Sequence, residues 1–421
     1  MGLVNNPQRS SRIGRSQVIG HRMMIPRSTS TSTATYLQHE SRIQFRTGPV
    51  DSNDIQFGYC SWFDSEAGTS GEAELTTNGN IRCALEMTTP TALAIKGKFG
   101  GVIVPLMNAG EVLLLSDFMP VTLTANTNYF AQSGYKALVI GDLIPTSQRS
   151  YNTNDRGFRS AGGSTQVGNT GSWSTPADSG SASDGWGPSL IIGVPRVPTP
   201  AVMLFGHSRI SGTGDTSTGD GFGNIGYAAR ALGNLDASHN VIPYTYVSKS
   251  GNTLAKEDYN PSFRKRRFFE YHTHVLWDNA VNDIANGVAL ATLQAQALRE
   301  FVEFKAAGLH VTAVCQLSKT TGAWTLADRS DQTISSGFAV GGVCDQFNAW
   351  LLSLVGGGLV DQVLDPRPLV QASDNKWLAD GTVAKYTADG THQTAFAHTL
   401  IATNQMLPWA TSLTVPAGVL G

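Results

Sequence analysis

Two short segments carry the residue types that nucleophilic hydrolysis needs. The first is GHSRISG (residues 206–212), where Ser208 lies between glycines directly after an apolar run; Ile210 stands where a GxSxG elbow would have its last glycine. The second is DGTH (residues 389–392), with Asp389 three positions before His392. A serine hydroxyl attacks when histidine takes its proton, and a carboxylate fixes the tautomer of that histidine. The two segments therefore predict an acyl-transfer triad.

Two further segments offer donors for a developing oxyanion. KSGNT (residues 249–253) contains Gly251, whose backbone N–H can approach a ligand, and NAVND (residues 279–283) contains Asn282, whose side-chain amide can donate. Each segment alone also fits a plainer interpretation. A serine in a glycine loop is commonly a turn residue, and Asp-x-x-His or Asn-Asp commonly caps a helix or forms a turn. The functional interpretation depends on all the segments together.

The elements that must position these segments follow from the pattern after residue 199. Strands are expected at 201–206, 240–251 (with a turn), 270–280, 309–317 and 358–365, and helices at 223–234, 288–307, 338–355 and 392–407. Alternating strands and helices indicate parallel βαβ units in an open sheet. Sites in such sheets lie beyond the carboxyl ends of the strands, which is where these segments fall.

The order of the segments resembles the SGNH hydrolases, also called the GDSL esterase family. LFGHSRISG resembles the first block, KSGNT the second, NAVND the third and DGTH the fifth, over about residues 199–410. The resemblance implies a three-layer SGNH-type (flavodoxin-like) α/β domain. It also implies a nucleophile at Ser208, a triad completed by Asp389 and His392, and an oxyanion hole formed by the N–H groups of Ser208 and Gly251 and the Asn282 amide. No metal or organic cofactor is expected.

Two positions depart from the family pattern. His207 replaces the usual Asp, which gives GHSR in place of GDSL, and Ala280 replaces the glycine of GxND. Neither change removes a catalytic group. The first alters the surroundings of Ser208, so a divergent or inactive member is the alternative interpretation.

The chain before residue 199 divides into three expected parts. Residues 1–48 hold seven arginines and one acid, a net of +6, and are expected as an extended arm, either loosely packed or docked onto a partner. Residues 49–158 show short apolar runs separated by turn signals, which indicates a β-sandwich. Residues 159–198 are rich in Gly and Ser and are expected as a loop or linker, whose Trp173 and Trp186 either pack it down or bind a sugar. Residues 199–421 form the hydrolase-like domain.

Composition limits the alternatives. Hydrophobic residues make up 41% of the 421 residues and charged residues 15%, which argues against disorder. The net charge of −2 excludes a uniformly basic nucleic-acid binder, and no run approaches the length of a membrane span. No apolar stretch follows the first arginines, so a signal peptide is not expected. The chain also has too few cysteines for a disulfide scaffold, and either paired or free thiols fit Cys60, Cys83, Cys315 and Cys344.

Three other groups invite a functional interpretation. His272 and His274 could be half of a metal site, but buried structural histidines are favoured. The run 264–267 (RKRR) could bind phosphate, but a solvated segment is favoured. Asp215 and Asp220 could bind calcium, but their spacing does not match an EF-hand.

The sequence therefore predicts a serine esterase that removes acetyl or other short acyl groups, with an acylated carbohydrate as the expected substrate. The alternative is a virion or surface assembly protein, homo-oligomeric or particle-bound through residues 1–48, with an accessory or inactive esterase domain. Phage particles or the extracellular space are favoured over the cytoplasm, and no nucleic-acid or membrane partner is expected.

Overall fold

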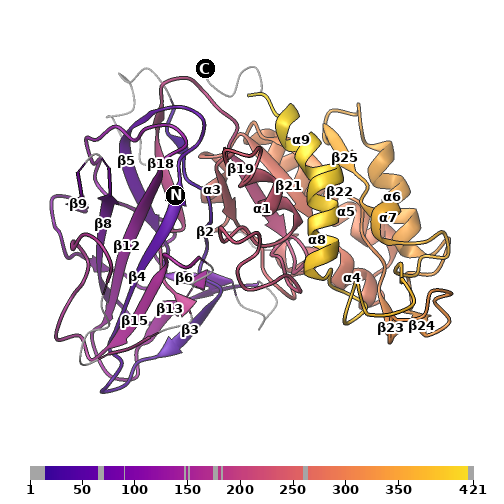
Figure 1. The fold of residues 1–421 in the computed structure, drawn as a ribbon, viewed down its shortest axis with the longest axis horizontal. Coiled ribbons are helices and arrows are strands. Elements are labelled where there is room, and N and C mark those ends of the chain that lie inside the picture. Colours follow the sequence, from indigo (N-terminus) through magenta and orange to yellow (C-terminus); the bar gives the residue numbers. More distant parts are fainter. Residues whose placement is uncertain are drawn as a thin grey trace.

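Two regions lie side by side along the long axis of the computed structural model, a β-rich region and an α/β region (Figure 1). The structure describes residues 15–64, 71–89, 91–146, 148–149, 152–173, 179–181, 184–258 and 264–415. Within these ranges, no helix has both the length and the apolar character needed to cross a membrane.

The α/β region is organised around a parallel sheet in the order β2-β20-β19-β21-β22-β25. These strands span Met23–Met24, Tyr244–Tyr246, Val202–Gly206, His274–Asp278, His310–Val314 and Gln362–Leu364. Counted from β19 along the chain, the order is 2-1-3-4-5, the flavodoxin-like arrangement, with β2 added at one edge. The α/β class expected from the sequence is confirmed. Such sheets bind ligands where the strand order reverses, here between β19 and β21.

Helices cover both faces of this sheet. Met203 and Phe205 of β19 join a core with α4, α5 and α6, whereas Val202 and Leu204 join a second core with α1, α8 and α9. The helices are α1 (Tyr227–Leu232), α2 (Leu254–Asp258), α3 (Arg266–Phe269), α4 (Val281–Ala285), α5 (Leu290–Ala306), α6 (Val343–Ser353), α7 (Arg367–Val370), α8 (Ala395–Ile401) and α9 (Leu407–Ser412), with a π-helical turn at Ala402–Met406. Burial on both faces explains why the strands read as nearly continuous apolar runs.

The β region contains two main antiparallel sheets that share one core. The larger follows the order β10-β8-β12-β4-β15-β16, with β9 also pairing with β8, and the smaller follows β1-β18-β5-β11. Phe45 of β4, Phe57 of β5 and Tyr135 of β12 all lie in the shared core.

The strands of these sheets are β1 (Gln17–Val18), β4 (Gln38–Arg46), β5 (Ser52–Tyr59), β8 (Gly79–Met87), β9 (Leu93–Lys96), β10 (Leu106–Met107), β11 (Leu114–Leu115), β12 (Asn128–Ala137), β15 (Arg156–Ser160), β16 (Ser179–Ser181) and β18 (Leu190–Pro195). Short two-stranded sheets pair β3 (Ser28–Thr31) with β13 (Leu143–Thr146), β6 (Trp62–Asp64) with β7 (Glu72–Glu74), β14 (Gln148–Arg149) with β17 (Asp184–Gly185), and β23 (Thr320–Gly322) with β24 (Gln332–Ile334).

Residues 15–48 are not the expected extended arm, because they are built into the sheets. β1 pairs with β18, β2 with β20, and β4 lies between β12 and β15. The arginines also act internally, since Arg22 pairs with Asp155 and Arg42 with Glu86. A local pattern cannot reveal carboxylates that lie this far away in the chain. Residues 1–14 of the expected arm lie outside the described residues.

The described part of 159–198 is likewise no free linker. β15 and β18 belong to the two main sheets, and both tryptophans are packed into cores. Trp173 stacks on Phe158, with 6.0 Å between ring centroids, and Trp186 lies 4.8 Å from Tyr59 by the same measure. Packing, rather than sugar binding, therefore accounts for these two side chains.

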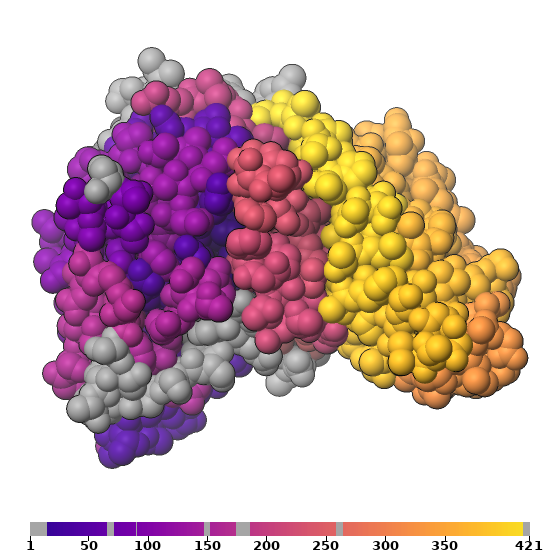
Figure 2. Space-filling model, in the orientation of Figure 1, coloured from indigo at the N-terminus to yellow at the C-terminus, as the bar shows by residue number. Residues whose placement is uncertain are grey.

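The two regions also share a core with each other. Val18, Trp62 and Leu190 from the β region belong to the same buried cluster as Phe205 and Phe268 from the α/β region. On the face drawn in Figure 2, the β region meets the segment that follows β19, which in turn meets the C-terminal helices. The α/β region is therefore packed as one body with the sheets that precede it.

Candidate active site

The loop that carries Ser208 begins at a glycine required by close backbone approach. β19 ends at Gly206, where φ is +141° and a Cβ would lie 1.9 Å from the carbonyl oxygen of Asp278. Only glycine permits this approach between the ends of β19 and β21. The next N–H, of His207, donates to the same Asp278 carbonyl at 3.1 Å. Ser208 follows at the carboxyl edge of the sheet and is 4% exposed.

Asp389 and His392 share one tight turn. The Asp389 carboxylate accepts the N–H of Thr391 at 2.8 Å and that of His392 at 2.7 Å through Oδ1. Its Oδ2 lies 2.6 Å from His392 Nδ1. Burial alone would raise the pKa of Asp389, but the hydrogen bond from the His392 ring and the two backbone N–H groups hold it well below its usual range. Asp389 therefore presents a stable carboxylate to the imidazole.

The structure brings these two residues to Ser208, which is 184 positions away from His392. His392 Nε2 lies 2.8 Å from Ser208 Oγ. Because Nδ1–H donates to Asp389, the lone pair of Nε2 faces the serine hydroxyl, as a general base requires. The three side chains thus form a continuous hydrogen-bonded line from carboxylate to hydroxyl.

The two expected oxyanion residues lie on the loops after the strands that flank β19. Gly251 follows β20, with φ +78°, and Asn282 lies in α4 after β21. Asn282 Nδ2 donates to the carbonyl of Asn252 at 2.8 Å, which joins these two loops. An amide NH₂ group carries two hydrogens, so Asn282 keeps a second donor beyond this bond.

The backbone conformation of Ala280 explains why the GxND motif has glycine at this position. Ala280 is fully buried and has φ +102°, a conformation that disfavours any residue with a Cβ. The turn into α4 therefore keeps its glycine-like backbone although the glycine is absent. This departure leaves Asn282 in the first turn of α4.

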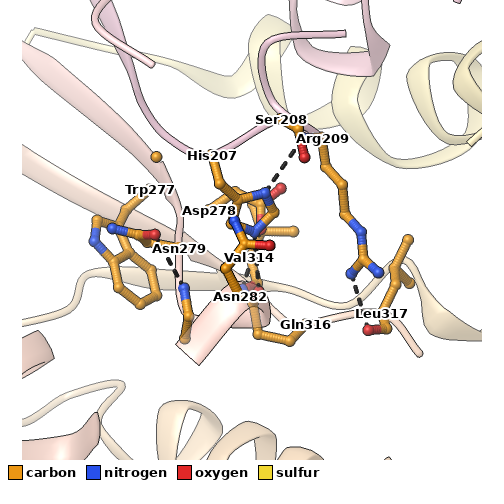
Figure 3. Close-up of polar contacts among 12 residues, drawn as sticks. His207, Ser208, Arg209, Trp277, Asp278, Asn279, Asn282, Val314, Gln316 and Leu317 are labelled. Carbon is orange, nitrogen blue, oxygen red and sulfur yellow. Dashed lines mark hydrogen bonds and ion pairs between the residues drawn. The ribbon is translucent and has the colours of Figure 1, made fainter. Parts of the chain in front are cut away.

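His207, the second departure, belongs to a buried polar network beneath Ser208 (Figure 3). Its Nδ1 accepts the N–H of Arg209 at 3.3 Å, so Nε2 carries the proton. That nitrogen lies 3.2 Å from Gln316 Oε1 and 3.4 Å from Asp278 Oδ1. Tyr227 donates its hydroxyl to the other Asp278 oxygen. The ring nitrogen Nε2 therefore faces both the Gln316 amide oxygen and the Asp278 carboxylate.

Asp278 is the carboxylate of this network. Burial acts to raise its pKa, but the interactions with His207, the Tyr227 hydroxyl and the Arg209 charge outweigh burial and lower it. In turn, burial and the adjacent carboxylate raise the pKa of Tyr227 well above its usual value. Sequence reasoning assigned no role here to Asp278, Gln316 or Arg209. What the sequence shows of them is a polar side chain at the end of a buried strand, or two or three residues after it.

The other candidate groups form internal contacts. His272 and His274 are buried, and burial lowers their pKa values to about 4 and about 3. Among the described residues, no group of three or more His, Cys, Asp or Glu could hold a metal ion. Asp215 pairs with Arg230 at 2.6 Å, and Asp220 binds the Asn224 amide at 2.8 Å.

The basic run 264–267 is solvated only in part, because Arg267 is exposed whereas Lys265 is buried; the expectation of a solvated segment is wrong for Lys265. Lys265 is 1% exposed and contacts both Asp64, at 2.7 Å, and Glu257. The arginines of the run also reach acids, among them Glu303. The charge of Lys265 is therefore neutralised inside the molecule, whereas the ion pair between Arg266 and Glu303 is partly exposed.

All four cysteines are free and buried.

No family model and no curated protein matches this chain. Among solved structures, the chain is similar to the psychrotrophic esterase EstA from Pseudoalteromonas sp. (14% identity, TM-score 0.37, covering 51% of this chain and 100% of that one). It is also similar to a variant of Axe2, an acetyl-xylooligosaccharide esterase from Geobacillus (15% identity, TM-score 0.37, covering 51% of this chain and 95% of that one). A third similar structure is a member of the lipolytic G-D-S-L family from Veillonella parvula (14% identity, TM-score 0.33, covering 51% of this chain and 100% of that one).

Proposed function

We propose that this protein is a serine hydrolase of carboxylic esters that acts through a covalent acyl-enzyme. The observation that carries the proposal is the line from Asp389 through His392 to Ser208, with separations of 2.6 Å and 2.8 Å. A nucleophile, its base and the group that orients the base are thereby within hydrogen-bonding distance, which is the arrangement acyl transfer requires.

In the proposed reaction, His392 takes the Ser208 proton as Oγ attacks the ester carbonyl carbon. The oxyanion receives hydrogen bonds from the N–H groups of Ser208 and Gly251 and from Asn282. His392 then donates its proton to the leaving alkoxide, which departs as the alcohol and leaves the acyl group on Ser208. Water, activated by the same histidine, releases the acid. Each oxyanion donor in such a site typically contributes about 2.7–4 kcal/mol.

We propose a short acyl group such as acetyl on the basis of the sequence resemblance. We retain an acylated carbohydrate as the proposed alcohol, on the sequence resemblance alone. Trp173 and Trp186 lie in cores and lend it no support.

The test is an ester panel on the wild type and Ser208→Ala, with aryl esters of increasing acyl length and acetylated polysaccharides. We expect acetyl esters to be hydrolysed fastest, with the activity lost in Ser208→Ala. An absence of Ser208-dependent turnover across the panel would overturn the proposal and favour an inactive, structural domain.

A further inference from the structure

The side chain of Arg209, the residue after the proposed nucleophile, reaches the loop that carries the proposed base. It is 1% exposed, and its guanidinium donates three hydrogen bonds. Nε donates to the carbonyl of Thr391 at 2.9 Å, and the two terminal nitrogens donate to those of Leu317 at 2.9 Å and Ser318 at 2.7 Å. Figure 3 shows the side chain extending from the Ser208 turn to Leu317.

These hydrogen bonds connect the direct neighbours of the proposed nucleophile and the proposed base. Arg209 follows Ser208 directly, and Thr391 directly precedes His392. The hydrogen bond between them closes a short ring that contains the Ser208–His392 contact. The bonds to Leu317 and Ser318 fix the guanidinium to the segment after β22, so the ring is anchored to the sheet.

Arginine suits this task because of its planar fork of donors. Three carbonyls from two segments accept from one guanidinium. An apolar side chain has no donors, and the three donors of an ammonium diverge from one nitrogen instead of forming a planar fork. Burial lowers the pKa of Arg209, although the charges of Asp278 and Asp389 oppose that effect. A fully buried cation bonded to carbonyls is costly to place, so a role beyond packing is expected.

We propose that Arg209 is a positioning residue that sets the distance between Ser208 Oγ and His392 Nε2. The inference rests on the proposed function for its kinetic consequence but not for its geometric one. Misplacing reacting groups by about 1 Å can cost roughly 100-fold in rate. Removing the guanidinium should therefore lower kcat and leave KM nearly unchanged, because the Arg209 side chain is buried and donates its hydrogen bonds to carbonyls of the protein.

The kinetic test compares Arg209→Lys and Arg209→Met with a matched control, Arg22→Met. Arg22 is another buried arginine, 1% exposed; it directly precedes β2, and its side chain pairs with Asp155 of the β region. All variants are assayed on p-nitrophenyl acetate at a temperature where circular dichroism shows each to be folded. We expect kcat to fall about 100-fold in both Arg209 variants with KM changed less than threefold. Arg22→Met should lose stability but keep the kcat of the folded enzyme.

A crystal structure of Arg209→Lys tests the positioning role without any measurement of activity. We expect the separation of Ser208 Oγ and His392 Nε2 to exceed hydrogen-bonding distance. A separation that stays at 2.8 Å, or a kcat equal to that of the wild type, overturns the inference while leaving the proposed function intact. If the wild type shows no Ser208-dependent hydrolysis, the proposed function is wrong. The separation of Ser208 Oγ and His392 Nε2 in the Arg209→Lys crystal structure then still decides whether Arg209 positions these two groups. If Arg209→Met does not fold, Arg209→Lys carries both measurements.

Discussion

Replacing His207 with aspartate, the residue that the resembled motif has at this position, should damage the protein. His207 Nε2 lies 3.4 Å from Asp278 Oδ1, and both side chains are buried. An aspartate at 207 is shorter, so its carboxylate would lie at about 5.5 Å from Asp278, where two like charges repel by roughly 3 kcal/mol at an effective dielectric of about 20. We expect His207→Asp to lower the free energy of unfolding by about that amount at pH 8.

The loss should depend on pH in a defined direction. Repulsion raises the folded-state pKa of the carboxyl pair above its unfolded value, so the pair retains a proton at low pH. The destabilisation is therefore smallest at acid pH and grows as the pH rises through that raised pKa. Urea denaturation at pH 5 and pH 8 measures the difference.

His207→Asn is the matched control, because it has the same size as aspartate, carries no charge, and keeps an oxygen that can accept the Arg209 N–H. The double variant His207→Asp/Asp278→Asn should recover most of the loss, since only one carboxylate then remains. Equal stability of the Asp and Asn variants at pH 8 would refute the reasoning, because it would show that the carboxylates at 207 and 278 do not interact.

Three further changes test other parts of the structure. Asp389→Asn should lower kcat by about 10³–10⁴, with little change in KM, because the His392 tautomer is lost; steady-state kinetics would contradict this if kcat fell less than tenfold. Lys265→Met should lower the free energy of unfolding by about 3–5 kcal/mol, because it leaves the Asp64 and Glu257 carboxylates buried without a cation. A decrease of less than 1 kcal/mol in urea denaturation would show that these three residues do not form a charged cluster. The four cysteines should react with a thiol reagent only after unfolding, since burial raises each thiol pKa to about 12; reaction in native buffer would show that a thiol is exposed.

The α/β region could be predicted from sequence because its signals are local. The alternation of strands and helices, and the helix at Leu290–Ala306, follow from periodicity over a few residues, with the helix two residues shorter at its start than expected. The flavodoxin-like strand order was implied only by the family resemblance, and the edge strand β2 was not predicted. The expected site residues were found in the same way, through short segments at strand ends. Their separations could not be predicted, because Ser208 and His392 meet only through the tertiary fold.

The expectation of an extended arm is wrong for residues 15–48, because the groups that pair with their charged side chains lie far away in the chain. β4 contains polar residues at positions that the structure buries, and Arg42 is accommodated by Glu86 on another strand. Charge counting along residues 1–48 therefore indicated an exposed arm. A residue's partner, not its own polarity, decides whether it is buried here.

The β region also bears on the proposed chemistry, through a chain of contacts that ends at the oxyanion side of the site. Asp64 of β6 contacts Lys265, which contacts Glu257 of α2. Glu257 accepts a hydrogen bond from the Asn252 amide, and the Asn252 carbonyl accepts one from Asn282 Nδ2. The orientation of Asn282 is therefore tied to a charge in the β region. Because β2 also completes the parallel sheet, the catalytic unit we propose includes both regions, and an α/β segment beginning at residue 199 would lack part of the support for its own active site.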